Sequence, residues 1–202
     1  MATEKKQYDV ISPWKLAHVV LRTTRLTEMV DFYKKFLGAQ VEFENDRACF
    51  LKYDEEHHRL GIITFDGMSG GGPSAPGLEH IAFTFHDLSD LVKVWEQRKV
   101  LGIEPMWCVN HGPTTSMYYV DPDGNKLESQ VDNFDDLEEQ HRFISSVNFM
   151  ENPVGTDFDP EDLKRRVESG EDHASIKRRI EIGPRAFPTM LFAAQTRTRS
   201  TE

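Results

Sequence analysis

The sequence predicts an α+β protein made of two tandem β-α-β-β-β modules and a C-terminal extension. An internal repeat is the first observation: LAHVVLRT at 16–23 and LEHIAFTF at 78–85 share their spacing, with a histidine two residues after each leucine. Each copy is followed by an amphipathic segment and then by three strand-like runs. The stretch DGMSGGGPSAPG at 66–77 is rich in Gly, Pro and Ser, so we expect a flexible connector between the modules.

The first module begins with the strand expected at 16–23. Apolar residues then recur at helical spacing, and Gly38 stands just past the expected end of this helix. The stripe consists of Leu26, Met29, Val30, Tyr33 and Leu37. Three further strands are expected at 39–44, 47–53 and 59–65.

The second module repeats this plan from the strand at 78–85. Asp87 is suited to cap the following helix, and Gly102 marks its end. The apolar stripe consists of Leu88, Leu91, Val92 and Trp95. The last three strands are expected at 104–109, 115–120 and 125–131.

These elements predict one folded domain with an appendage. The extension is charged and interrupted by Pro and Gly, and Asp159-Pro160 predicts the start of a helix that runs to Glu168. It could cover the mouth of the active site, pack against a second subunit in a homodimer, or be solvated. The expected parts are an N-terminal arm at 1–13, a domain at 14–133 (modules at 14–66 and 77–133, linker at 67–76), and an extension at 134–202 with short helices and a frayed end.

Composition narrows the class of partner. A formal net charge of -10 disfavours nucleic acid and anionic membranes, since both require an excess of Lys and Arg on one face. No apolar run is long enough to cross a bilayer, and MATEKKQYDVISPW has no secretory signal pattern, so we expect a cytoplasmic protein. Cys49 and Cys108 lie in apolar strand-like runs and are interpreted as small buried residues. A small-molecule substrate fits best.

Two histidines and one glutamate form a candidate metal site. His18 and His80 hold equivalent positions in the repeats, and Glu128 lies in the last strand of the second module, after the Asp-Gly-Asn turn. Two His and one carboxylate are typical of non-haem Fe(II) sites for oxygen chemistry. The corresponding strand of the first module, RLGIITF at 59–65, contains no fourth ligand, although Asp66 just beyond it leaves a four-ligand site open.

The second module resembles a known family. Residues 109–128, VNHGPTTSMYYVDPDGNKLE, contain a small residue, a His two positions later, an apolar-Tyr pair, Asp-Pro-x-Gly and a final Glu. This pattern is similar to that of the single-domain extradiol ring-cleavage dioxygenases of the vicinal-oxygen-chelate superfamily. The resemblance implies that the modules form an open metal-binding barrel. It also implies that Fe(II) is held by His18, His80 and Glu128.

The resemblance also implies three catalytic residues. Tyr118 and His111 fall on family positions that contact substrate or oxygen, and a family acid–base His falls on the HHR at 57–59. We assign the acid–base to His58 rather than His57, because His58 stands at the family's spacing from the apolar strand that follows. Many members of the superfamily carry an additional non-catalytic domain that is missing here, and the connector between His58 and His80 is longer than usual, which leaves the identity of the substrate open.

The implied reaction is cleavage of a catechol-type ring next to its two hydroxyls by O2. His58 would accept and return a phenol proton, Tyr118 would donate a hydrogen bond to a substrate or oxygen atom, and His111 would steady the same region. Two other functions remain open from the sequence. One is a metal-dependent isomerase, lyase or epimerase of the same superfamily, and the other is a metal-free binding protein that sequesters an aromatic ligand.

Overall fold

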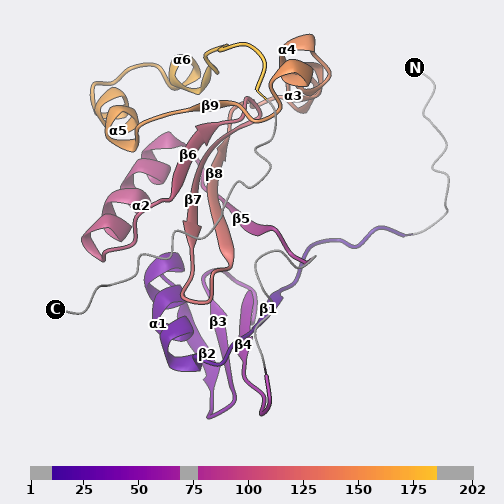
Figure 1. Ribbon diagram of the computed structural model, residues 1–202, viewed down its shortest axis with the longest axis vertical. Helices are drawn as coiled ribbons and strands as arrows, with labels where there is room; N and C mark the ends of the chain where they lie inside the picture. Colours follow the sequence, from indigo (N-terminus) through magenta and orange to yellow (C-terminus); the bar gives the residue numbers. More distant parts are fainter. Residues whose placement is uncertain (1–10, 69–76, 186–202) are drawn as a thin grey trace. The chain divides into compact units, whose positions relative to one another are not determined.

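A computed structural model describes residues 11–68 and 77–185 (Figure 1). The chain divides into two compact units, Met1–Met68 and Ser69–Glu202, and the division falls within the connector expected from the sequence. The outer part of the predicted N-terminal arm, most of the predicted linker and the predicted frayed end lie outside the described residues.

The first unit is a four-stranded sheet with one helix on one face (Figure 1). The strand order is β1-β4-β3-β2; β1 and β4 are parallel, and the other pairs are antiparallel. Met29, Tyr33 and Phe36 of the helix are buried together with Cys49 and Ile62 of the sheet. Gly38 ends the helix in the left-handed conformation, as expected from the sequence. The elements are β1 (Val19–Arg22), α1 (Leu26–Leu37), β2 (Gln40–Glu44), β3 (Ala48–Lys52) and β4 (Leu60–Ile63).

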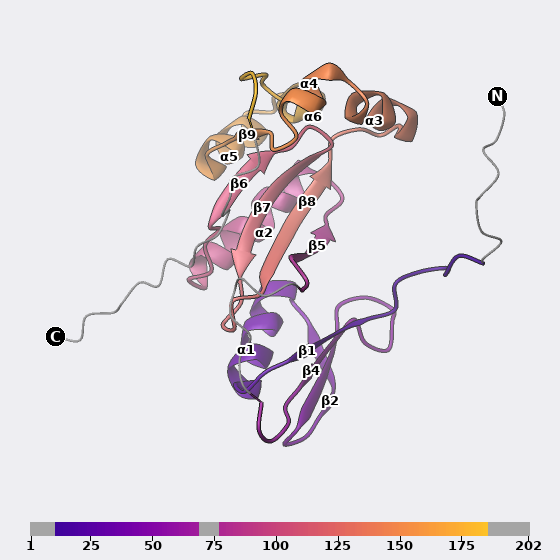
Figure 2. The same cartoon turned by 45° about the vertical axis from the view of Figure 1, so that its right-hand side comes forward.

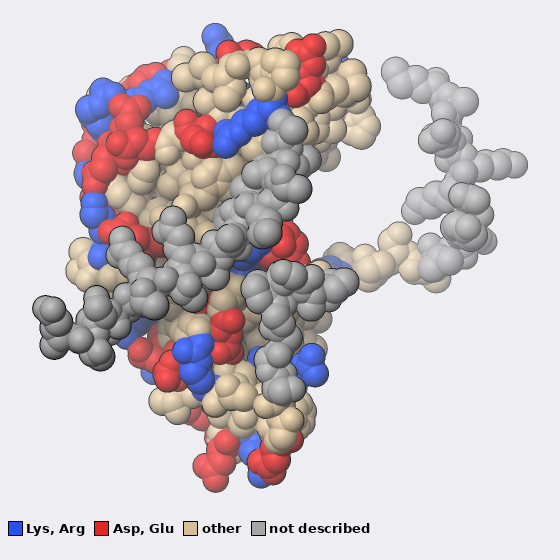
Figure 3. Space-filling view, in the orientation of Figure 1, with Lys and Arg blue, Asp and Glu red and all other residues tan. Residues whose placement is uncertain are grey.

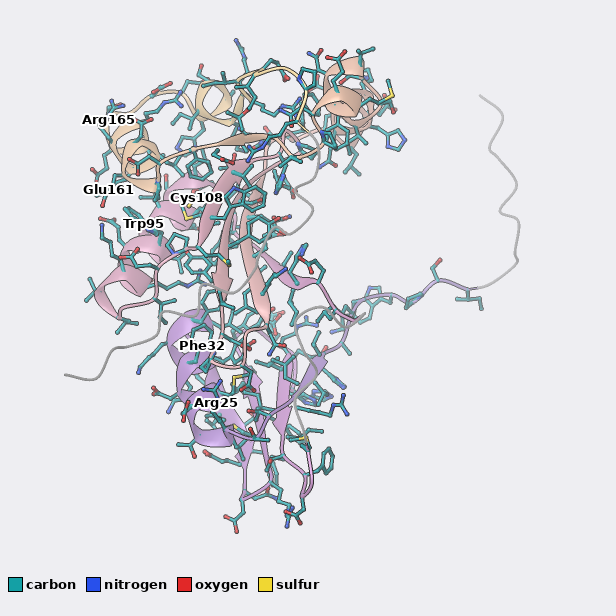
Figure 4. All side chains as sticks on the ribbon, in the orientation of Figure 1. Arg25, Phe32, Trp95, Cys108, Glu161 and Arg165 are labelled. Carbon is teal, nitrogen blue, oxygen red and sulfur yellow. The ribbon has the colours of Figure 1, made fainter. Side chains whose placement is uncertain are left out.

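The second unit repeats this topology and confirms the predicted α+β plan. Its strand order is β5-β8-β7-β6-β9, in which the first four strands match the first unit one for one. Asp87 caps the helix by accepting a hydrogen bond from the Asp90 amide at 3.0 Å. Figure 4 labels Trp95 of the helix and Cys108 of the sheet, which are both buried. The elements are β5 (His80–Thr84), α2 (Leu88–Val100), β6 (Trp107–Asn110), β7 (Thr114–Val120) and β8 (Lys126–Asp132).

The strand register makes the repeat exact at the level of single positions. Val20 pairs with Gly61 in the first sheet, and Ala82 pairs with Glu128 in the second. His18 stands two residues before Val20, and His80 stands two residues before Ala82. Gly61 is therefore the positional counterpart of Glu128. Each sheet by itself is open.

The extension packs on the second sheet beside β6 (Figure 2). The helix predicted from Pro160 to Glu168 is confirmed as α5, and the Asp159 side chain caps it by accepting from the Glu161 amide at 2.9 Å. Burial of Val154, Leu163 and Ile176 shows that the segment is not simply solvated. Its elements are α3 (Leu137–Ile144), α4 (Val147–Glu151), β9 (Thr156–Asp157), α5 (Pro160–Glu168) and α6 (His173–Lys177).

Charges of both signs are interspersed over the outer surface of the extension (Figure 3). Lys99 of α2 pairs with Glu161 of α5, and Lys164 of α5 pairs with Glu96 of α2 at 3.1 Å. Such exposed pairs each contribute about 0–1 kcal/mol, so the buried residues supply most of the docking energy. Over the described ranges, no helix has the length and apolar character required to cross a membrane.

Both cysteines are buried and unpaired, as predicted. Burial raises the pKa of Cys49 to about 11 and that of Cys108 to about 12.

Candidate active site

The open face of the second sheet, opposite α2, carries a buried carboxylate and a histidine in contact. Glu128 of β8 is flanked by Ala82 of β5 and Tyr118 of β7, and its side chain is only 5% exposed. The Nε2 atom of His80 lies 3.1 Å from Oε2 of Glu128. Alternation along the strands places these side chains on one face, which is why residues distant in sequence meet here.

The two groups polarise each other. The hydrogen bond that His80 donates to Glu128 raises the pKa of His80 and outweighs the opposing effect of burial. Burial alone would raise the pKa of Glu128, but hydrogen bonds from His80, Ser116 and Tyr118 lower it below its ordinary value. The site therefore favours an ionised carboxylate, which is the form that binds a metal ion.

The same pair fits one edge of a metal site. Two ligand atoms that lie about 2.1 Å from a metal at right angles are about 3 Å apart, which agrees with the contact between His80 and Glu128. An imidazole nitrogen and a carboxylate oxygen are ligands that iron accepts. Within either unit, the described residues do not bring three metal-ligating side chains together.

Tyr118 and His111 form a second polar pair beside this carboxylate. The Tyr118 hydroxyl lies 2.9 Å from Nε2 of His111 and also hydrogen bonds to Glu128. The Nδ1 atom of His111 lies 2.5 Å from the Val154 carbonyl oxygen, which can only accept, so Nδ1 carries a proton. Burial lowers the pKa of His111 and raises that of Tyr118.

The remaining candidates belong to the first unit. His18 directly precedes β1, and its ring centroid lies 4.4 Å from that of His58. His58 in turn stacks on Phe50 with centroids 4.8 Å apart. Burial, together with the nearby His18 and His57, lowers the pKa of His58. The His57 side chain is 67% exposed, so it is the more solvated of the two neighbouring imidazoles.

The structure thus places His18 with His58, and His80 with Glu128, Tyr118 and His111. These two groups belong to different units, so the three-ligand site as a whole stays a prediction. His57 is largely exposed, whereas His58 is stacked on Phe50. The assignment of the acid–base to His58 stays a prediction as well.

Comparison with known proteins decides the family. The model described as "Glyoxalase/Bleomycin resistance protein/Dioxygenase superfamily" matches residues 15–129. The chain belongs to the glyoxalase/bleomycin resistance protein/dioxygenase superfamily. Membership confirms the resemblance seen in the sequence, and the matched range runs from before β1 into β8 and does not reach the extension.

The chain is also similar to three curated relatives, two of them named as biphenyl-2,3-diol dioxygenases and one as a metapyrocatechase. Biphenyl-2,3-diol 1,2-dioxygenase 2 of Rhodococcus globerulus is 41% identical over 157 residues, covering 77% of this chain and 83% of the relative. Biphenyl-2,3-diol 1,2-dioxygenase 3 of the same organism is 41% identical over 170 residues, covering 82% and 88%. Metapyrocatechase 2 of Cupriavidus necator is 25% identical over 137 residues, covering 65% and 40%. The alignment with the two Rhodococcus relatives is longer than the superfamily range of 15–129, so it includes part of the chain beyond the modules.

Sequence reasoning missed Trp107 and the residues that hold it. The Trp107 ring stacks on Tyr118 with centroids 5.0 Å apart, and its Nε1 donates to Asp157 at 2.9 Å. Arg185 donates two hydrogen bonds to the same carboxylate, at 2.8 and 3.0 Å. Alternation in the predicted strand at 104–109 could have placed Trp107 on the face of Tyr118. No sequence signal marks Val154, because its contact with His111 is made by a main-chain carbonyl.

Proposed function

We propose that this protein is an Fe(II)-dependent extradiol dioxygenase that cleaves a catechol-type ring next to its two hydroxyls with O2. The observation that carries the proposal is the His80–Glu128 pair beside the Tyr118–His111 pair, in a chain 41% identical to two biphenyl-2,3-diol dioxygenases over most of their length. The substrates of those relatives support an aromatic diol as the class of substrate.

His18, His80 and Glu128 would hold the iron. The ionised, hydrogen-bonded state of Glu128 and its distance from His80 both fit this role. When bound, Fe(II) supplies open positions at which a diol and dioxygen can meet. His18 is assigned by its position in the repeat, which matches that of His80.

His58 is the proposed proton acceptor. Its lowered pKa keeps the imidazole neutral at pH 7, so it can take the proton that a catechol hydroxyl loses and return it later. Phe50 packs flat against its ring and holds its orientation.

Tyr118 and His111 of the second unit would act on a substrate or oxygen atom. The protonated Nδ1 of His111 is committed to the Val154 carbonyl, which aims Nε2 at the Tyr118 hydroxyl. Tyr118 is a neutral phenol whose single proton can be donated to Glu128, to the unprotonated Nε2 of His111 or to a substrate oxygen. Trp107 stacked on Tyr118 places an apolar ring beside the hydroxyl.

Two features argue against the alternative functions. A lyase or isomerase with four ligands needs a side chain at the counterpart of Glu128, where this chain has Gly61. Asp66, the alternative ligand, is exposed and paired with Arg47 at 3.0 Å. A metal-free protein that sequesters an apolar ligand has no use for an ionised Glu128 and its hydrogen-bonding partners, because burying polar groups costs free energy that an apolar lining does not.

The proposal includes a cytoplasmic location and a homodimer. The two unpaired thiols support a reducing compartment. Sedimentation of the purified protein would measure the assembly, and a monomer at assay concentrations would remove the dimer from the proposal.

The deciding experiment measures oxygen uptake by protein reconstituted anaerobically with Fe(II), using biphenyl-2,3-diol and a panel of catechols. We expect one O2 consumed per diol and a yellow ring-fission product, both abolished in His18→Ala. His86→Ala, which removes another exposed histidine, is the matched control and should retain activity. No uptake across the panel, together with activity on a non-oxidative substrate in the presence of Zn or Ni, would favour the lyase class instead.

A further inference from the structure

We infer that Arg179, in the C-terminal extension, is a positioning residue that sets the tautomer and orientation of His111. Its connection to catalysis rests on the proposed function, in which His111 aims the Tyr118 hydroxyl. The contacts themselves lie within the second unit and can be tested without any assay of activity.

Arg179 gathers main-chain carbonyls from separate segments. Its side chain is 1% exposed. The Nη1 atom donates to the carbonyl of Asn152 at 2.7 Å and to that of His111 at 3.1 Å, and Nη2 donates to the carbonyl of Asn148 at 3.1 Å. Glu181 completes the set with hydrogen bonds at 2.8 and 3.1 Å. A buried guanidinium is tolerated only when its donors are satisfied, so removing it would leave several carbonyls without a partner.

The loop held by Arg179 ends in the carbonyl that contacts His111. The Asn152 side chain accepts from the Gly155 amide at 2.7 Å and donates to the Gly155 carbonyl at 3.2 Å, which fixes both sides of Val154. Gly155 has φ +103°, and a Cβ there would lie 2.2 Å from the Asn110 carbonyl oxygen. This close approach packs the loop against the end of β6, so the position of the Val154 carbonyl has little freedom.

The second side of His111 is also fixed by the extension. A Cβ on Gly112 would lie 2.1 Å from Cε1 of Phe143, so the turn after His111 packs directly on this ring. The Arg179 guanidinium lies 5.0 Å from the centre of the same ring. Arg179 thus contacts both the loop whose Val154 carbonyl accepts from His111 and the Phe143 ring on which the turn after His111 packs.

The chemical consequence concerns which imidazole nitrogen carries the proton. With the Val154 carbonyl in place, Nδ1 keeps its proton and Nε2 faces Tyr118. If the loop relaxes, the proton is free to move to Nε2 and the ring is free to turn, so the Tyr118 hydroxyl loses its fixed direction. A tautomer set by an outer hydrogen bond is a typical way to orient a working histidine.

The first test measures the tautomer of His111 directly by ¹⁵N NMR of the full-length protein, loaded with diamagnetic Zn(II) and labelled at histidine. The His111 signal is identified by its loss in His111→Asn. We expect the Nδ1-protonated form in the wild type and in Arg178→Ala, whose exposed arginine adjoins Arg179. Arg179→Ala should give a mixture of tautomers. A pure Nδ1-protonated signal in Arg179→Ala would overturn the inference.

The second test compares turnover. In Arg179→Ala we expect kcat to fall about 10- to 100-fold at unchanged iron content, because an outer partner is lost but no metal ligand. Guanidinium at low millimolar concentration should restore part of kcat in Arg179→Ala and none in Arg178→Ala. Full kcat without guanidinium would contradict the inference. So would a loss of kcat with an unchanged tautomer.

Arg179→Lys serves if circular dichroism shows that Arg179→Ala does not fold. Lysine keeps the charge but cannot reach three carbonyls at once, so the same mixture of tautomers is expected. A wild-type protein without dioxygenase activity would remove the proposed function, while the tautomer measurement would still decide the role of Arg179.

Discussion

The two modules share a scaffold but differ in what their open faces carry. Both have the same element order and strand order, and Gly61 and Glu128 occupy equivalent positions in them. The side chains nearest Gly61, Val20 and Phe50, are apolar. Around Glu128 the face is polar and hydrogen-bonded. The difference shows that topology is set by the buried helix-facing side chains, which leaves the opposite face free to specialise.

The modules also differ in what lies beside them. Among residues 11–68 and 77–185, the extension adds a strand to the second sheet alone, through pairing of β9 with β6. Through this contact the extension reaches His111 and Trp107. The module that carries Glu128, Tyr118 and His111 is therefore the one with added support.

The largest expected effect comes from removing the feature that distinguishes the second module. Glu128→Gln should lose both iron and ring cleavage, because a neutral amide binds a cation far more weakly than the ionised carboxylate does. Iron content and oxygen uptake measure this. Asp132→Asn is the matched control, since it changes an exposed carboxylate on the same strand. Stoichiometric iron in Glu128→Gln would remove Glu128 from the site.

Making the modules alike should abolish activity but not metal binding. Gly61→Glu places a carboxylate at the counterpart of Glu128, so iron should be retained while oxygen uptake falls to background as an open position is filled. Gly61→Ala is the control: its Cβ would lie 3.2 Å from a Val20 methyl, and Val20 is 45% exposed and able to shift. Full oxygen uptake in Gly61→Glu would show that the repeat does not extend to the metal site.

A smaller effect is expected from one hydroxyl. Tyr118→Phe removes the donor between His111 and Glu128, and kcat should fall by about 100-fold with iron retained. Tyr119→Phe is the matched control, because Tyr119 is buried on the opposite face of the same strand. Steady-state kinetics with saturating diol separate the two variants, and equal kcat values in both would argue against a catalytic hydroxyl.

The smallest effect concerns docking of the extension at low pH. Burial opposes ionisation of Asp157, but hydrogen bonds from Arg185 and Trp107 outweigh it and lower the pKa below 3.8. This stabilisation is present above pH 3.8 and is lost as the pH falls through the lowered value. Trp107 fluorescence should therefore change in acid at a lower pH than a free carboxylate would give. Asp157→Asn should lack that transition, and an identical acid profile would contradict the assignment.

Much of the scaffold was predictable because it follows periodic rules. The helical stripe ending at Gly38, the Asp87 cap and the helix at 160–168 depend on local sequence, and all three are confirmed. The strand β9 was not predicted, because two residues are too few to show alternation. The hydrogen bond between His111 and the Val154 carbonyl could not be predicted either. Every residue has a main-chain carbonyl, so the residue type at 154 gives no signal.

Some residues of the candidate site could be predicted from the sequence, and others could not. His80 and Glu128 were predicted to meet from the repeat and from the family pattern, and the register of β5 and β8 brings them into contact. The role inferred for Arg179 depends on contacts 68 residues away in sequence. Neither composition nor spacing encodes such a distant contact.

The burial of both thiols has a consequence for an enzyme that works on catechols in air. Catechols autoxidise to electrophilic quinones, which react with thiolates. Cys49 and Cys108, with pKa values of about 11 and 12, are protonated at neutral pH and shielded from solvent. The described fold thus offers no reactive sulfur to a by-product of its own proposed substrate, so inactivation by quinones should fall on other nucleophiles or on the iron.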